Sequence, residues 1–511
     1  MCRFARGLIS TLLLLQGGCA LLHPDVPAAV LSQRIFPAAD LAMTPASLGD
    51  PVEELPAPRP VPREEADAVG LSKPMAPPIS PADTGALTLE QALDMAQRAN
   101  PHLEAMRERI ARAEGGQIAS FAEFLPSSRI LYRHIQDPSG SESFVLPTLP
   151  ENLVGNLAFG GNANRFDLAE MHLQWTVCDF GRRTGKYGQA KMSVDIARLQ
   201  YRRALQSVAF SVASQYFGVL QAEATTRVAE EAVRRAEVDL RDARNFLRRG
   251  VGLRNQVLRT EALLAEMRLN LIKARTARSV AIAGLNQAIG INVSSDTQVV
   301  DRPAAPPFAV SLADCLQLAV SSREEFGVVL DSIRSARFGV GVAQADFMPR
   351  VMVGGVAAHE MNNVGGRADL LSGGLAIDLV LFEGGKRLGQ VRMAEAEARV
   401  ALAQGKEVCD QIAYEVNVAY VAMADAHERI FQAEKAVTAG TENLRVVRNQ
   451  LERGDATPTD VADGELVITR AQQSYYTALY DYQIAMARLA YAVGLPVGMD
   501  FTAHAGGANH E

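Results

Sequence analysis

The sequence predicts a mainly α-helical protein with a small β part, built from two copies of one structural unit. Blocks of the chain recur at constant offsets, and within each copy the hydrophobic pattern changes from a helical period to strand alternation and back. The helical stretches are also unusually long, since the 68 residues of Arg182–Arg249 contain no proline. We therefore expect two structural repeats, each of long antiparallel helices plus a β-hairpin.

The two copies begin with matching segments. Leu87–Pro126 and Val310–Pro349 share their apolar positions, and each position in the second lies 223 residues after its match. A later block repeats with an offset of 204, because Asp179–Arg183 (Asp-Phe-Gly-Arg-Arg) corresponds to Glu383–Arg387 (Glu-Gly-Gly-Lys-Arg). The two offsets differ by 19, so the first copy carries a 19-residue insertion between these blocks. Self-similarity of this kind indicates one unit used twice.

Composition and repeats divide the chain into six parts. In order they are residues 1–19, a signal peptide; 20–86, a proline-rich extended arm; 87–290, the first repeat; 291–309, a linker; 310–495, the second repeat; and 496–511, a C-terminal tail. Between His23 and Pro81 lie 13 of the 24 prolines, without a helical or strand period. Such a segment is typical of a tether or a wrapping arm rather than a domain.

The first residues have the pattern of an export signal. Arg3 and Arg6 precede the apolar run Gly7–Leu15, which is too short to span a membrane as a helix. Two processing outcomes fit. Either Cys19 ends a lipobox and becomes a lipidated N-terminus, or an ordinary signal peptidase cuts after Ala20. We favour lipidation, because a cysteine so close to the apolar run has little other use.

Two helices open the first copy, separated by Asn100-Pro101, a pair that ends one helix before the next begins. The first is Leu87–Asn100, with Thr88 as its N-cap, and the second is Pro101–Glu123. The long helix that follows the strands would measure about 100 Å. Its apolar stripe recurs 204 positions later: Leu205, Val208, Val212, Tyr216 and Val219 match Cys409, Ile412, Val416, Tyr420 and Met423.

A glycine ends each long helix, and a shorter helix returns. The return helices are Asn255–Ile289 and Thr459–Val493, each of 35 residues. A helix of 35 residues covers only half of a partner of 68, so we expect the 23-residue helix that precedes the strands to cover the other half. Each copy is then a long helix paired with two short helices placed end to end.

Each copy also supplies two strands whose apolar side chains share one face. We expect strands at Arg129–His134 and Phe166–Val177 in the first copy, and at Arg350–His359 and Asp369–Leu381 in the second. The first pair is separated by Asp137–Asn164, a loop rich in Gly, Ser, Asn and Pro. Copy two has a much shorter loop there.

Four strands cannot close a barrel, and an open sheet edge within a membrane leaves backbone groups without partners at several kcal/mol each. The chain is therefore expected to oligomerise until the sheet closes. Two protomers would supply about 8 strands and three about 12, and bacterial outer-membrane barrels include both sizes.

Several motifs occur in a fixed order along Leu87–Leu495. They are Leu89, Ala92 and Leu93 followed by Asn100-Pro101 and Pro126; then Asp179–Arg183; then Gly454, Asp460-Val461 and Asp463. In this order, and doubled, they resemble the TolC family of outer-membrane channel proteins. The resemblance implies a trimeric α-barrel/β-barrel duct: a homotrimer with a 12-stranded β-barrel in the outer membrane and a 12-helix α-barrel that crosses the periplasm.

Members of this family are exit ducts for tripartite efflux pumps and for type I protein secretion. They dock onto a periplasmic adaptor protein and an inner-membrane transporter. The resemblance therefore predicts a passive exit duct in the outer membrane, in contact with outer-membrane lipid, and the lipid anchor and the proline-rich arm favour the efflux branch. Type I secretion is the alternative. A non-pore exported coiled-coil scaffold is the alternative of another class, although it leaves the doubled strand pairs unexplained.

Two acids at the start of the second return helix are the candidate channel constriction. Thr457 is expected to be an N-cap, Pro458 the first helical residue and Asp460 the acid of a capping box. Asp463 is not needed for capping, and it lies three positions on along the same helical face as Asp460. At matching positions the TolC family carries acids that ring the channel entrance. Copy one has Gln256 and Arg259 there, and Arg259 is expected to pair with the acids.

Several function classes lack support in the sequence. The net charge of −7 gives no basic surface for nucleic acid. After the signal only Cys178, Cys315 and Cys409 remain, with neither disulfide nor metal spacing. His359-Glu360 lacks the second histidine of a zinc-protease helix, and the eight histidines are scattered. We therefore predict no enzymatic activity, no metal site and no cofactor.

Overall fold

The computed structural model describes residues 86–136, 144–145, 158–159, 165–250, 252–300, 310–362 and 367–496. The predicted signal peptide with Cys19 lies outside the described residues, as do the arm except for Ala86 and the C-terminal tail except for Pro496. The chain forms two compact units. Unit 1 comprises the described parts of residues 106–201 and 324–409, and unit 2 those of residues 86–105, 202–323 and 410–496.

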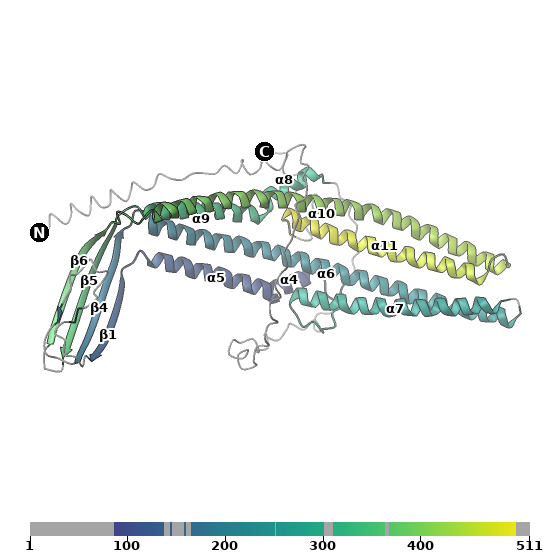
Figure 1. Ribbon diagram of the computed structural model, residues 1–511. Helices are drawn as coiled ribbons and strands as arrows, with labels where there is room; N and C mark the ends of the chain where they lie inside the picture. The colour runs from purple at the N-terminus through teal and green to yellow at the C-terminus, as the bar shows by residue number, and fades with distance from the viewer. Residues whose placement is uncertain are drawn as a thin grey trace. The chain divides into compact units, whose positions relative to one another are not determined.

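The same order of elements occurs twice along the chain (Figure 1). The first set is α4 (Leu89–Ala99), α5 (Pro101–Ala122), β1 (Ser127–Gln136), β4 (Arg165–Cys178), α6 (Arg182–Arg248) and α7 (Arg254–Ile289). The second set is α8 (Leu312–Ser322), α9 (Glu324–Ala345), β5 (Arg350–Asn362), β6 (Arg367–Asp378), α10 (Lys386–Arg453) and α11 (Pro458–Val493). This confirms the predicted fold class of two repeats, each with long antiparallel helices and a β-hairpin.

The short helices that open the two repeats begin in the same way. Thr88 caps α4 and forms a capping box with Gln91, while Ser311 caps α8 and forms one with Asp314. In such a box the hydroxyl accepts a hydrogen bond from the backbone N–H three residues on, and the side chain at that position accepts one from the N-cap N–H. The N-cap predicted at Thr88 is confirmed.

In unit 2 the link between the two short helices of each repeat holds the end of the return helix. Asn100 Nδ2 donates to the carbonyl oxygen of Ala288 over 2.8 Å. Arg323, which lies 223 positions after Asn100, donates from Nη1 to the carbonyl oxygen of Ala492 over 2.8 Å. Because the last carbonyls of a helix have no partner within the helix, these side chains satisfy groups that would otherwise be unpaired.

A glycine with positive φ ends each return helix at this same joint. Gly290 and Gly494 both have φ of 90°. A Cβ atom on Gly290 would lie 2.6 Å from the carbonyl oxygen of Ala99, and one on Gly494 would lie 2.9 Å from that of Ser322. Only glycine meets both demands, a left-handed backbone and a close backbone approach.

Unit 1 contains a four-stranded antiparallel sheet in the order β1-β4-β5-β6 (Figure 1). All four strands differ at one or both ends from the predicted ranges, since β1, β4 and β5 are longer than predicted and β6 begins and ends earlier. β6 ends at Asp378 rather than Leu381, because the ladder with β5 ends where Arg350 pairs with Asp378. The β5–β6 ladder continues to Met361–Arg367, so the second loop is shorter than predicted. The first loop contains a short antiparallel pair, β2 (Phe144–Val145) with β3 (Ala158–Phe159).

Four helical stretches lie side by side in unit 1, in the order α5, α6, α9, α10. Gln117 of α5 donates to the hydroxyl of Tyr187 of α6 over 3.1 Å, and Gln189 of α6 donates to the carbonyl oxygen of Ser335 of α9 over 3.3 Å. Gly405 of α10 lies against Val329 of α9. The layer of helices therefore follows the order of the strands, with α5 and α10 at its edges.

In unit 2 the order is α7, α6, α11, α10. Arg275 of α7 pairs with Glu230 of α6 at 3.0 Å. Asp481 of α11 accepts from Gln221 of α6 at 3.1 Å and from Arg429 of α10 at 3.2 Å. The predicted apolar stripe of α6 and α10 is buried in this unit at Val208, Val212, Tyr216, Val219, Ile412, Val416 and Met423.

The described residues lack two features, a membrane-spanning helix and a metal site. No helix among them is both long and apolar enough to cross a membrane. Nor do the described parts of the chain contain three or more His, Cys, Asp or Glu side chains grouped so that they could hold a metal ion.

Candidate functional site

The turn from strand to long helix is built by the repeated Asp/Glu-x-Gly-x-Arg block. Arg183 Nε donates to Asp179 Oδ2 over 2.9 Å, and its Nη1 donates to the carbonyl oxygen of Thr176 over 2.6 Å. In the second repeat Arg387 donates to Glu383 over 3.0 Å and to the carbonyl oxygen of Val380 over 2.9 Å. The arginine therefore satisfies carbonyls at the turn, so the motif is structural in both copies.

The acidic tip is the start of α11 and its surroundings in unit 2. The backbone N–H of Thr457 donates to Asp460 Oδ2 over 2.7 Å, and the N–H of Asp460 faces Thr457 Oγ1 at 3.4 Å. Pro458 is the first helical residue. The predicted cap, proline and capping-box acid are all confirmed. Hydrogen bonds from the Thr457 backbone and hydroxyl, and then the charge of Arg259, hold the pKa of Asp460 below its ordinary value.

Asp463 faces the first repeat at the acidic tip. Arg259 Nη2 of α7 donates to Asp463 Oδ1 over 3.2 Å, and both side chains are more than half exposed. The predicted pairing of Arg259 with the acids is confirmed. An exposed pair of this kind contributes little to stability, about 0–1 kcal/mol. It does bring the starts of the two return helices together, with two carboxylates and one guanidinium in contact with solvent.

A buried charge cluster is centred on Glu465 of α11, two residues after Asp463. Glu465 is 6% exposed, and its two carboxylate oxygens contact Arg448 of α10 and Arg235 of α6. Arg235 also donates to Thr469 over 3.1 Å. Both arginines are thus engaged by Glu465, and Asp239 Oδ2 of α6 has no hydrogen-bond partner. Burial and then the Glu465 charge raise the pKa of Asp239 to about 6.

Sequence reasoning missed this buried charge cluster, although one signal for it was present. Arg448 and Glu465 lie 204 positions after Arg244 and Glu261, and the latter two are also paired, at 2.6 Å. A charge pair that recurs in both repeats across the tip indicates a contact. The second pair is buried because another helix covers it. The sequence pattern of α11 alone does not reveal which helix does so.

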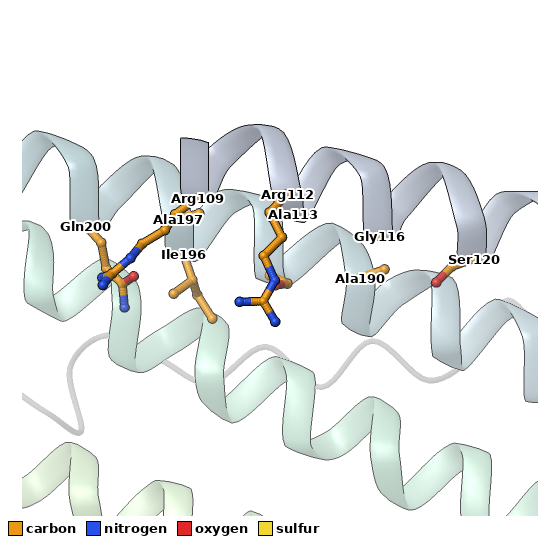
Figure 2. Close-up of a pocket in the computed structure, with 10 residues that line it drawn as sticks. Arg109, Arg112, Ala113, Gly116, Ser120, Ala190, Ile196, Ala197 and Gln200 are labelled. Atoms are coloured by element: carbon orange, nitrogen blue, oxygen red, sulfur yellow. The ribbon is translucent and has the colours of Figure 1, made fainter. Parts of the chain in front are cut away.

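Two shallow grooves run between helices. In unit 1, a groove of about 460 Å³ lies between α5 and α6, with Arg109 and Arg112 of α5 near Ile196 and Gln200 of α6, and its other lining residues are small (Figure 2). In unit 2, a groove of about 480 Å³ between α6 and α7 includes the Arg244–Glu261 pair. The lining of neither groove combines a nucleophile with a base, so neither has the arrangement that acyl or phosphoryl chemistry needs.

Comparison with known proteins shows which family has this architecture. The family model described as outer membrane efflux protein matches residues 92–291 and 315–495. The chain belongs to the outer membrane efflux protein family. The matched segments correspond to the two repeats of the fold, and membership places the protein in the outer membrane.

Two relatives align with about half of the chain, and one of them is named for secretion. It is 22% identical over 303 residues to the alkaline protease secretion protein AprF of Pseudomonas aeruginosa, covering 58% of this chain and 63% of that protein. It is 26% identical over 246 residues to protein CyaE of Bordetella pertussis, covering 47% of this chain and 52% of that protein. The alignments thus span less than two thirds of either relative.

The fold agrees with a solved channel of the same class. The Campylobacter jejuni CmeC outer membrane channel has a TM-score of 0.69 and 16% sequence identity, over 89% of this chain and 96% of that one. At this identity the likeness shows the fold. The recognised resemblance to the TolC-type channels and the predicted fold class are therefore confirmed.

Proposed function

We propose that three copies of this chain close into the outer-membrane duct of a tripartite efflux pump, through which substrates leave passively. The observation that carries the proposal is that a single copy leaves both edges of its sheet without a neighbouring strand. Within the described sheet, β1 and β6 each have a strand partner on one side only. An unpaired edge inside a membrane costs several kcal/mol per backbone group, and closure by further copies removes that cost.

The helical edges of unit 1 support the same conclusion. α5 exposes Ile118 and Phe121, and α10 exposes Met393 and Val400. These residues lie on the two outermost helices of the layer. Large apolar side chains on both edge helices are typical of a surface that another protein covers. A neighbouring copy on each side covers both edges, and three copies give about 12 strands, a barrel wide enough for a lumen.

The candidate constriction is the ring that Asp460 and Asp463 would form in the trimer. Two acids per copy give about six carboxylates around one opening, which favours cations over anions. Arg259 reduces this negative charge where it contacts Asp463. The constriction is thus an acidic ring from the second repeat, partly neutralised by the first.

The partners of the duct follow from the family. A periplasmic adaptor protein and an inner-membrane transporter would supply substrate and energy, and the duct itself needs no catalytic group or cofactor. Residues 20–86 would serve as an extended arm behind a lipid attached to Cys19. Replacing Cys19 by serine is expected to abolish labelling by a fatty-acid analogue and to leave the trimer intact, since closure of the barrel does not need the lipid.

Type I protein secretion is the second candidate function. It is favoured by the name of one relative, the alkaline protease secretion protein AprF. Deletion of the gene separates the two roles: loss of an efflux duct sensitises the cell to small toxic compounds, whereas loss of a secretion duct removes a protein from the culture medium.

Single-channel recording in planar bilayers tests the duct directly. The purified protein is expected to give discrete conductance steps with cation selectivity. The double variant Asp460→Asn and Asp463→Asn should keep its helix content, because asparagine can still cap, and should lose selectivity and block by multivalent cations. Steps with unaltered selectivity would restrict these acids to capping. A protein without conductance would be the coiled-coil scaffold instead.

A further inference from the structure

The exposure pattern of β6 continues past the end of the strand. From Leu371 to Leu381 every odd-numbered residue is exposed, and every even-numbered residue is partly or fully covered. The hydrogen-bonded ladder ends at Asp378, yet Leu379 and Leu381 keep the alternation. Apart from Gly373, the exposed series consists of large apolar residues: Leu371, Leu375, Ile377, Leu379 and Leu381.

The length of this exposed series matches a membrane better than the strand alone does. Outer-membrane strands tilt by about 40°, and their apolar band is about 25 Å tall. At about 3.3 Å per residue, Leu371 to Ile377 spans about 20 Å along the strand and about 15 Å of membrane thickness. Leu371 to Leu381 spans about 33 Å along the chain and about 25 Å of thickness. The part of the series that belongs to the sheet is therefore too short to cross the apolar band. The connection between β6 and α10, which carries Leu379 and Leu381, supplies the difference.

Polar residues mark both ends of the series. Asp369, the outward residue before Leu371, has 85% of its side chain exposed and pairs with His359. After the series comes Phe382, which is 86% exposed, and then Glu383 and Lys386. Lysine beside an apolar surface reaches the headgroup region while its stem stays in the apolar layer. Charged groups therefore lie on both sides of an apolar band of the required height.

The backbone of the connection also has a partner where the ladder ends. Arg387 Nη1 donates to the carbonyl oxygen of Val380 over 2.9 Å. A carbonyl without a partner would be costly close to hydrocarbon. The repeated arginine thus allows an apolar segment to leave the sheet at membrane depth.

The first repeat does not have the same extension. Along β4 the exposed series is Ala169, Met171, Leu173 and Trp175, and the next outward residue, Val177, is only partly exposed. Trp175 Nε1 donates to the carbonyl oxygen of Phe124 over 2.8 Å, which ties the indole to the end of α5. The longer apolar connection is therefore particular to the second repeat.

We propose that the connection between β6 and α10, at Leu379, Leu381 and Phe382, is part of the lipid-contacting surface and sets the periplasmic boundary of the membrane on this chain. The occupant of this surface is the hydrocarbon of the outer membrane. The proposal rests on the proposed barrel, and it adds a segment that belongs to no strand.

The single tryptophan of the chain makes a direct test practical. In a Trp175→Phe background, one tryptophan is placed at Phe382, at Leu375 in the sheet, or at Phe431, an exposed phenylalanine of α10 in unit 2. Each trimer is reconstituted into phosphatidylcholine vesicles with brominated acyl chains, which quench tryptophan within the hydrocarbon. Native mass spectrometry confirms the trimer for each variant beforehand.

We expect fluorescence to fall at least twofold for the probes at Phe382 and Leu375, and to stay unchanged for the probe at Phe431. Quenching at Leu375 with none at Phe382 would place the membrane boundary at the end of the strand and overturn the inference while leaving the barrel intact. Absence of quenching at Leu375 would overturn the barrel, and the inference with it.

Discussion

The hairpins α6–α7 and α10–α11 come from one repeated sequence but are held together by different forces. Four arginine–glutamate pairs join α7 to α6 on the surface: Arg244–Glu261, Arg268–Glu237, Arg275–Glu230 and Arg278–Glu223. In the second repeat, 204 positions later, only the first pair has charged residues at both equivalent positions. The equivalents of the fourth pair are His427 and Tyr482, whose ring centroids lie 5.3 Å apart. α11 buries 17 residues where α7 buries 9, so apolar packing replaces the ion pairs.

The difference follows from position in the layer of helices. α7 is an edge helix in unit 2, whereas α11 lies between α6 and α10 and has two protein neighbours. Exposed ion pairs contribute about 0–1 kcal/mol each, but each large apolar side chain that is fully buried contributes about 1.5–3 kcal/mol. A duplicated sequence can therefore hold one return helix, α7, by surface ion pairs at an edge and the other, α11, by apolar packing in the middle of the layer.

The joint at Gly290 and Gly494 has the same geometry in both repeats. Substitutions there should cause the largest loss of folding stability. Gly494→Ala combines a positive φ with a Cβ atom 2.9 Å from the Ser322 carbonyl oxygen. We expect a loss of about 3–5 kcal/mol. Gly454→Ala is the control, with φ of 85° and nothing within 4 Å, and should cost about 1–2 kcal/mol. Equal urea midpoints for the two variants would refute the close-approach argument.

An arginine–glutamate pair occurs at equivalent positions in both hairpins, and its removal should cause the next largest loss of stability. Glu465→Ala leaves Arg235 and Arg448 without their buried carboxylate and should cost roughly 3 kcal/mol. Its repeat equivalent, Glu261→Ala, removes an exposed pair and should cost below about 1 kcal/mol. Urea unfolding followed by circular dichroism measures both. A cost at Glu261 as large as that at Glu465 would contradict the assignment of edge and centre.

The buried charge cluster should also make the stability of unit 2 sensitive to pH, because the cluster joins α6 to α10 and α11. The pKa of Asp239 is raised from 3.8 to about 6, so folding favours the protonated carboxyl. That contribution is complete below pH 3.8 and is lost as the pH rises through about 6. Asp239 faces Arg235 and Asp242 of its own helix, Arg448 of α10 and Glu465 of α11.

Replacing Asp239 by asparagine keeps the uncharged form at every pH. We expect the variant to be more stable than the parent near pH 8, by about 1–2 kcal/mol after allowance for partial exposure, and equally stable near pH 4. Thermal melting over this range measures the difference. A difference that is independent of pH would mean that the pKa of Asp239 is the same in the folded and unfolded states, which would contradict the raised value.

Helix capping at the tip gives the smallest expected effect. Thr457→Ala should cost about 1 kcal/mol, because it removes the hydroxyl of the capping box. In the first hairpin Leu253 occupies the N-cap without a side-chain cap, so Leu253→Thr should gain up to about 1 kcal/mol. Melting temperatures that move in opposite directions would confirm this asymmetry; a loss at Leu253 would contradict it.

The sequence predicted most of the fold because the two repeats carry the same local signals. Thr88, Thr457 and Pro458 mark helix starts by their own chemistry, and the stripe through Val212 and Val416 marks the buried faces. The end of β6 was predicted too late, because Leu379 and Leu381 keep the strand's alternation although no ladder partner is present. Alternation reports which face is apolar, whereas the end of a strand depends on its neighbour.

The candidate site was only partly predictable. The capping role of Asp460 and its proximity to Arg259 follow from spacing, and the structure confirms both. The buried charge cluster around Glu465 depends on α6 lying over α11, which is a tertiary contact that no local pattern contains. Nothing in the residues near Asp239 distinguishes it from the exposed acids of the same helix.

The central claim is that one copy is incomplete and that three copies close both the sheet and the layer of helices. Native mass spectrometry of the protein extracted in mild detergent tests it most directly. We predict a single dominant species of three chains that persists on dilution, because each copy leaves the edges of β1 and β6 unpaired. A stable monomer that retains its β-sheet signal would contradict the claim.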